Sequence, residues 1–109
     1  MDNHFFSIST SESFEELLRR SNERPVIIFK HSITCPISSA AYREMARIEH
    51  VALVEVQYAR ELSKEIERRT GISHESPQVL VIRRGKVVWE ATHFQVKASQ
   101  VENAVRENA

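Results

Sequence analysis

The stretch from Val26 to Ser38 reads VIIFKHSITCPIS, and it decides how the rest of the chain can be arranged. Its first four residues are apolar, β-branched or aromatic, and they follow Pro25, which is typical of a short strand buried on both faces. A mostly polar segment then leads to Cys35 and Pro36. Because the first helical position has no use for a backbone N–H, proline fits there, and a helix is predicted to begin at Pro36.

Cys35, the single cysteine of the chain, is therefore expected at the start of a helix that follows a buried strand. Amide N–H groups at a helix start stabilise negative charge, and the thiolate is the reactive form of cysteine. A free thiol with a pKa of roughly 8.5 is only about 7% thiolate near a pH of about 7.4. A helix start contributes about 1 kcal/mol and a neighbouring cation a similar amount, which together would make thiolate the major form.

The alternative is a buried and inert cysteine, since free cysteines are often of that kind. The polar residues just before Cys35 favour an exposed corner instead, and they are Lys30, His31, Ser32 and Thr34. Lys30 and His31 are themselves expected to be solvated rather than catalytic.

The bulk composition bounds the class of protein. The 109 residues suit one domain, residues 1–109, and 15 basic against 15 acidic residues give no electrostatic reason to bind nucleic acid. No apolar run approaches the length of a membrane span, and the first residues do not resemble a signal peptide, so a cytoplasmic location is expected. One cysteine excludes an internal disulfide, and five scattered histidines make a metal site improbable, so no metal ligand is predicted.

The hydrophobic pattern predicts alternating strands and helices. Parallel strands joined by helices form an α/β layer, and a short turn at 83–86 joins the last two strands as an antiparallel hairpin. The predicted fold class is α/β, with a central mixed sheet and helices on both faces. Strands are expected near residues 4–8, 26–30, 52–56, 78–82 and 87–91, and helices near 12–21, after 36, over 61–70 and around 101–105.

This order, with a cysteine after a buried strand and a proline before a later one, resembles the thioredoxin fold over nearly the whole chain. The string from Thr34 to Ser38 looks like a glutaredoxin Cys-Pro-X-Cys site whose second cysteine is serine. Together with the strings His74–Gln78 and Gly85–Trp89, it resembles the monothiol bacilliredoxins, the YtxJ-type thioredoxin-like proteins.

The resemblance implies a cytoplasmic thiol–disulfide oxidoreductase of redox homeostasis and stress response. Its thiol co-substrate would be bacillithiol, a small cysteine-containing thiol, its partners S-bacillithiolated client proteins, and it would hold no permanent cofactor. Cys35 is then the catalytic residue. Thr34, Pro36, Ser38 and His31 are expected to support the thiolate. By the same analogy the Ser76–Pro77 bond would be cis and face Cys35, and Ser76, Pro77 and Gln78 would bind substrate.

Two other functions stay open at this point. One is an iron–sulfur carrier like the monothiol glutaredoxins, although those usually have glycine where Pro36 stands. The other is a redox-inert adaptor or a stress sensor modified at Cys35. A phosphatase or arsenate-reductase loop would need an arginine six residues after the cysteine, where this chain has Ala41.

Overall fold

A computed structural model describes residues 5–34 and 36–109 of the chain. Strands and helices alternate in the predicted order, and a short 3-10 helix, η1, follows the last strand. The strands are β1 (Phe5–Ser7), β2 (Val26–His31), β3 (Val51–Glu55), β4 (Gln78–Arg83) and β5 (Lys86–Thr92). The helices are α1 (Ser11–Arg20), α2 (Pro36–Met45), α3 (Arg60–Thr70), η1 (His93–Gln95) and α4 (Ala98–Glu107).

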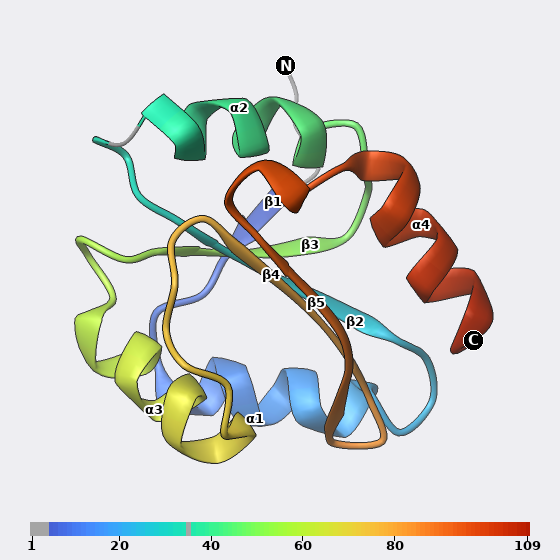
Figure 1. Cartoon of the computed structure of the whole chain (residues 1–109). Coiled ribbons are helices and arrows are strands. Elements are labelled where there is room, and N and C mark those ends of the chain that lie inside the picture. The colour runs from blue at the N-terminus through green and yellow to red at the C-terminus, as the bar shows by residue number, and fades with distance from the viewer. Residues whose placement is uncertain (1–4, 35) are drawn as a thin grey trace.

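One mixed sheet with the strand order β1-β3-β2-β4-β5 crosses the middle of the molecule (Figure 1). Strands β1, β3 and β2 are parallel, whereas β4 is antiparallel to both β2 and β5. The carboxyl end of β2 therefore lies beside the carboxyl end of β3 and the amino end of β4. We call this end of the sheet the open end. Three segments enter or leave the sheet there: 32–34, 56–59 and 73–77.

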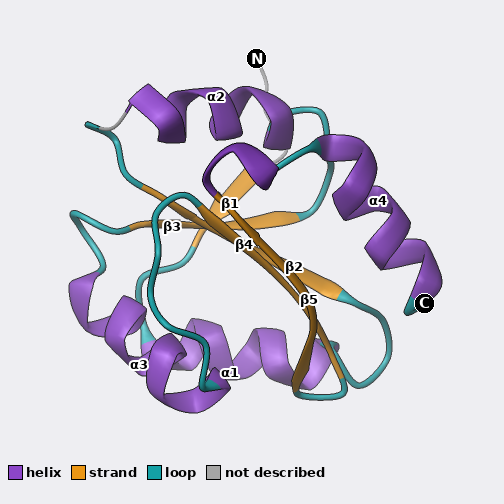
Figure 2. Cartoon of the chain, viewed as in Figure 1, coloured by secondary structure: helices purple, strands orange, loops and turns teal. Residues whose placement is uncertain are grey.

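Helices cover both faces of the sheet (Figure 2). Helices α1 and α3 pack on one face, where Phe14 and Ile66 meet Ile28 and Leu80 in one core cluster. Helices α2 and α4 pack on the other, in a cluster that includes Met45, Val101, Phe29 and Val81. Successive residues of β2 thus alternate between the two clusters, as a strand with both faces covered must.

The first strand departs from the sequence-based expectation. It was predicted near residues 4–8; His4 lies outside the described residues, and the strand spans Phe5–Ser7. Ile8 is buried, but Phe6 is 37% exposed. The reason is that β1 is an edge strand paired only with β3, so less of the protein covers it.

Helix α3 ends as predicted. Gly71 caps it in the left-handed conformation with φ of 73°, and its N–H donates to the Glu67 carbonyl. Glycine adopts this conformation without a steric penalty, and Ile72 then packs against the core beneath α3. The chain leaves this cap in the 73–77 segment, which returns it to the open end of the sheet.

Candidate functional site

Lys30 and His31, at the end of β2, are both buried, so the prediction that they are solvated is wrong. Lys30 is fully buried and His31 is 7% exposed. The polarity of a pair at a strand end suggested solvent, but helices and loops cover both faces of the sheet there. His31 lies against Tyr42 of α2 with ring centroids 4.9 Å apart, while Lys30 points to the α3 face.

Burial lowers the pKa values of both side chains. It lowers the pKa of Lys30 to about 8, against an opposing pull from the Glu67 and Glu75 carboxylates. It also lowers the pKa of His31, which Glu55 partly offsets. His31 is therefore neutral at neutral pH, while Lys30 still carries its charge on most molecules. Among the described residues, neither Lys30 Nζ nor His31 Nδ1 has a hydrogen-bond partner.

Ser38 and Thr34 belong to one polar network at the open end. The Ser38 hydroxyl, fully buried on α2, accepts a hydrogen bond of 3.3 Å from the Ser32 backbone N–H. This bond ties the first turn of α2 to the end of β2. It leaves the Ser38 hydroxyl hydrogen free to donate elsewhere.

Gln57, which the sequence analysis did not single out, holds the 32–34 segment. Its Nε2 donates to Ser32 Oγ at 2.8 Å and to Thr34 Oγ1 at 3.2 Å, and its Oε1 accepts from the Ile33 N–H at 3.2 Å. Its position just past β3 could have identified Gln57 from the sequence. The carboxyl ends of neighbouring parallel strands lie side by side, so a polar residue there lies close to the end of β2.

The 73–77 segment forms the opposite wall of this edge. The Ser76–Pro77 peptide bond is cis, the conformation that the resemblance implies, and Pro77 is buried. The Pro77 carbonyl accepts from the His93 N–H at 3.0 Å, and Ser76 Oγ is buried with no partner among the described residues. The side chain of Gln78 is buried and donates to the Ser73 carbonyl at 3.1 Å, so it holds the segment in place.

Cys35 lies outside the described residues. Pro36, the next residue, is the first residue of α2, as predicted. The structure therefore brings Thr34, Pro36 and Ser38 together along one stretch. It places Ser76, Pro77 and Gln78 on the strand that pairs with β2 and on the segment leading into it, where Gln78 is the register partner of Lys30.

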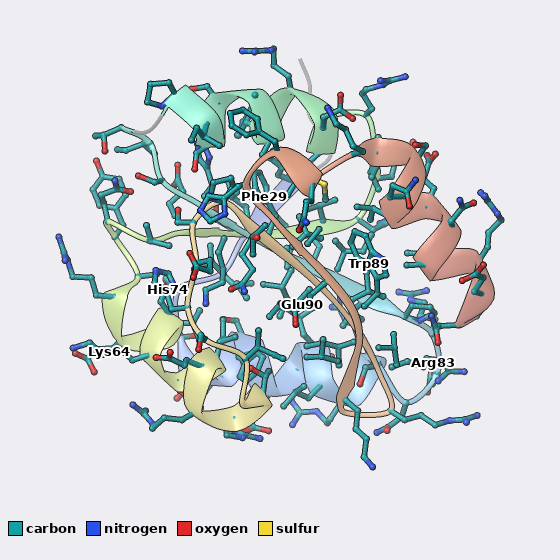
Figure 3. All side chains as sticks on the ribbon, viewed as in Figure 1. Phe29, Lys64, His74, Arg83, Trp89 and Glu90 are labelled. Carbon is teal, nitrogen blue, oxygen red and sulfur yellow. The ribbon has the colours of Figure 1, made fainter. Side chains whose placement is uncertain are left out.

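A pocket of about 440 Å³ opens between α3, the segment after β3 and the 73–77 segment. Gln57 is one of its walls, so the pocket adjoins the residues that precede Cys35. His74 and Lys64, labelled in Figure 3, lie on the same side of the molecule as α3. The other main lining residues are Arg60, Ser63 and Glu67.

No group of three histidine, cysteine or acidic side chains suited to a metal ion occurs in residues 5–34 and 36–109. Within the same ranges, no helix has both the length and the apolar character that crossing a membrane requires.

Most of the chain matches a family of known proteins. Residues 6–101 match the model of the family described as monothiol bacilliredoxin BrxC. The match includes every residue named in the candidate site, from Lys30 to Gln78.

Solved structures share the architecture. A thioredoxin-fold protein described as a candidate oxidoreductase superposes with a TM-score of 0.85 at 30% identity, over 93% of both chains. The thioredoxin of Malassezia sympodialis gives 0.73 at 15% identity, over 98% of this chain and 92% of its own. The Schistosoma mansoni thioredoxin pre-protein gives 0.71 at 15% identity, over 97% and 99%. The predicted thioredoxin-like fold is thereby confirmed.

Proposed function

We propose, from the premise that this chain belongs to the monothiol bacilliredoxin BrxC family, that it removes bacillithiol from protein mixed disulfides in the cytoplasm, with Cys35 as its nucleophile. The family and the fold are those of monothiol thiol oxidoreductases. The finer assignment rests on the single observation that the only cysteine directly precedes Pro36, the first residue of α2.

The reaction needs one thiolate and one outside thiol. The Cys35 thiolate attacks the bacillithiol sulfur of a client–S–S–bacillithiol disulfide, and the client sulfur leaves as a thiolate that takes up a proton. Cys35 then carries bacillithiol in a new disulfide. A second thiol attacks the bacillithiol sulfur, forms an outside disulfide and returns Cys35 to its thiolate, so the client is reduced and the outside thiols are oxidised.

The described residues support this chemistry through position and charge. Ser38 and Thr34 offer hydroxyls on either side of residue 35, and the amino end of α2 favours an anion. Neutral His31, packed on Tyr42 of α2, contributes no charge. Ser76 and Pro77 provide the wall along which a bound client would lie.

The test follows the mass of the protein. After incubation with a bacillithiolated client, the wild type should gain one bacillithiol while the client recovers its free thiol, and Cys35→Ser should abolish this transfer. Failure of the wild type to take an adduct from either bacillithiol or glutathione mixed disulfides would reject the oxidoreductase and favour a redox-inert adaptor. A brown protein with visible cluster absorption would favour the iron–sulfur carrier.

Ser38 refines the test. Ser38→Ala should slow the transfer if the free hydroxyl hydrogen supports the thiolate, whereas Ser39→Ala, an exposed neighbour on the same helix, should leave the rate unchanged. Ser38→Cys should let the protein release its own adduct by forming a disulfide with Cys35. Equal rates for Ser38→Ala and Ser39→Ala would remove Ser38 from the thiolate-supporting residues.

A further inference from the structure

The pocket beside α3 has more cationic than anionic groups in its wall. Arg60 and Lys64 line it, opposed by Glu67, and Arg60 forms no ion pair with a described carboxylate. Lys64 lies 4.0 Å from the exposed Glu61 at the rim, a distance that leaves its ammonium open to other partners. Arginine in particular presents a planar set of donors that matches a carboxylate.

A buried donor in the wall of this pocket lacks an acceptor among the described residues, and so does a buried ammonium that is attracted by a lining carboxylate. Ser63 lines the pocket, is 6% exposed, and its Oγ has no partner among the described residues. Lys30 Nζ is also buried and unpartnered, and Glu67, a lining residue, attracts its charge. Buried donors are normally hydrogen-bonded, so the unsatisfied Ser63 hydroxyl in the wall of a cavity supports an acceptor that comes from outside.

No described lining group forms a hydrogen bond with Ser63 Oγ or Lys30 Nζ. The Glu67 carboxylate accepts from the His74 backbone N–H at 3.0 Å, which fixes it to the wall. Partial burial and the charge of Lys30 lower the pKa of His74, so its ring is neutral at neutral pH. The site is therefore rich in donors and would favour an anionic ligand.

Its position links the pocket to the proposed reaction. Gln57 is both a pocket wall and the hydrogen-bond partner of Thr34, and consecutive Cα atoms are only about 3.8 Å apart. A small thiol whose sulfur reacts at residue 35 would thus have its remaining atoms within reach of the pocket. The volume of about 440 Å³ is in the range of small-molecule sites.

We infer that this pocket binds a carboxylate of an acidic low-molecular-weight thiol, with Arg60 and Lys64 as its ionic partners and Ser63 as a hydrogen-bond donor. The inference rests on the proposed function, and it assigns the part of the small thiol that is distant from the sulfur. Client proteins would make their contacts along Ser76 and Pro77, which do not line the pocket.

The experiment compares two disulfides on the same proteins. A bacillithiolated peptide tests recognition of the acidic thiol, and 2,2′-dithiodipyridine, a neutral disulfide, reports on Cys35 alone. Arg60→Gln with Lys64→Gln should lower kcat/KM for the bacillithiolated peptide about tenfold, the loss of roughly one charged contact. The reaction with 2,2′-dithiodipyridine should change less than about twofold, because the pocket is not used.

Two controls and one further variant make the result specific. Arg24→Gln with Lys86→Gln removes the same charge from exposed positions away from the pocket and should leave both rates unchanged. Arg60→Lys with Lys64→Arg keeps the charge and should retain most of the activity. Ser63→Ala should raise KM for the bacillithiolated peptide and leave 2,2′-dithiodipyridine unaffected.

The outcomes separate the two proposals. A wild type that reacts with 2,2′-dithiodipyridine but not with the bacillithiolated peptide would reject the proposed function, and the inference with it. A wild type that reacts with both, combined with an unchanged peptide rate in the Arg60 and Lys64 variant, would overturn the inference alone. An equal fall in both rates would overturn it too, because the substitutions would then act on Cys35 rather than on ligand binding.

Discussion

Buried polar groups are hydrogen-bonded at one end of the sheet, whereas several at the other end lack a partner among the described residues. At the β4–β5 turn, Ser21 is fully buried; its Oγ accepts from the Gly85 N–H at 2.9 Å, and its carbonyl accepts from Arg83. At the open end, four buried polar atoms have no partner among the described residues: Lys30 Nζ, His31 Nδ1, Ser63 Oγ and Ser76 Oγ. Figure 1 shows these ends on opposite sides of the molecule.

The difference concerns which polar groups stabilise the fold and which ones we expect to serve the proposed reaction. Hydrogen bonds at the turn connect the hairpin to the loop after α1 and to the carboxyl end of α4. Unpaired buried groups cost stability, and a ligand or substrate that supplied the missing partners would offset that cost. We therefore expect substitutions at the turn to change stability alone, and substitutions of the unpaired groups at the open end to leave stability unchanged or to improve it.

The largest effect is expected for Lys30. Its pKa falls from 10.5 to about 8 in the folded protein, so between these values the unfolded chain binds more protons and the free energy of unfolding rises with pH. The full difference corresponds to about 3 kcal/mol. Urea titrations at several pH values should show this rise in the wild type, and Lys30→Met should lack it and be the more stable protein below pH 8. Parallel pH profiles for the two proteins would show that the ammonium is not desolvated.

The next effect concerns the opposite end. Arg83→Ala removes two hydrogen bonds of 3.0 Å, to the carbonyls of Ser21 and Asn108, and should lower the free energy of unfolding by about 2 kcal/mol. Its rate of bacillithiol transfer should equal that of the wild type. Lys86→Ala, at an exposed position of the same turn, is the control and should change neither. A slower transfer by Arg83→Ala would contradict the separation of the two ends.

A smaller effect on stability is expected for Gln57. Gln57→Ala removes its contacts to Ser32, Ile33 and Thr34, at a cost of about 1 kcal/mol, because the side chain is only half-buried. Transfer should slow several-fold, since the segment before Cys35 loses its support. Gln100→Ala, on the exposed face of α4, is the matched control. An unchanged transfer rate would show that the network does not position the cysteine.

The smallest effect is expected for the charge of His31. Burial lowers its pKa, so the ring is already neutral where the thiolate forms, and it has no charge to lose. His31→Ala should shift the pH midpoint of Cys35 alkylation by less than about half a unit. A shift of about one unit toward higher pH would show that a protonated imidazole supports the thiolate after all.

The sequence alone was sufficient for the order of the elements, and it named a candidate site along the chain. The apolar run of β2, the proline that begins α2 and the glycine that ends α3 act locally, through burial, a missing N–H and a positive φ. Pro36, Ser38, Ser76 and Pro77 followed from motif strings, which are local as well.

Only the tertiary structure decided which polar residues are buried and which of them contact each other. Lys30 and His31 look like a solvated strand end in the sequence, yet both are buried. Helix α2 covers His31, and Lys30 lies on the face that packs against α3. Gln57 and Ser63 carry no local signal, because their role depends on how α3 and the 73–77 segment pack against the ends of β2 and β3. Desolvation and hydrogen-bond pairing are set by neighbours distant in sequence, and hydrophobic periodicity does not encode them.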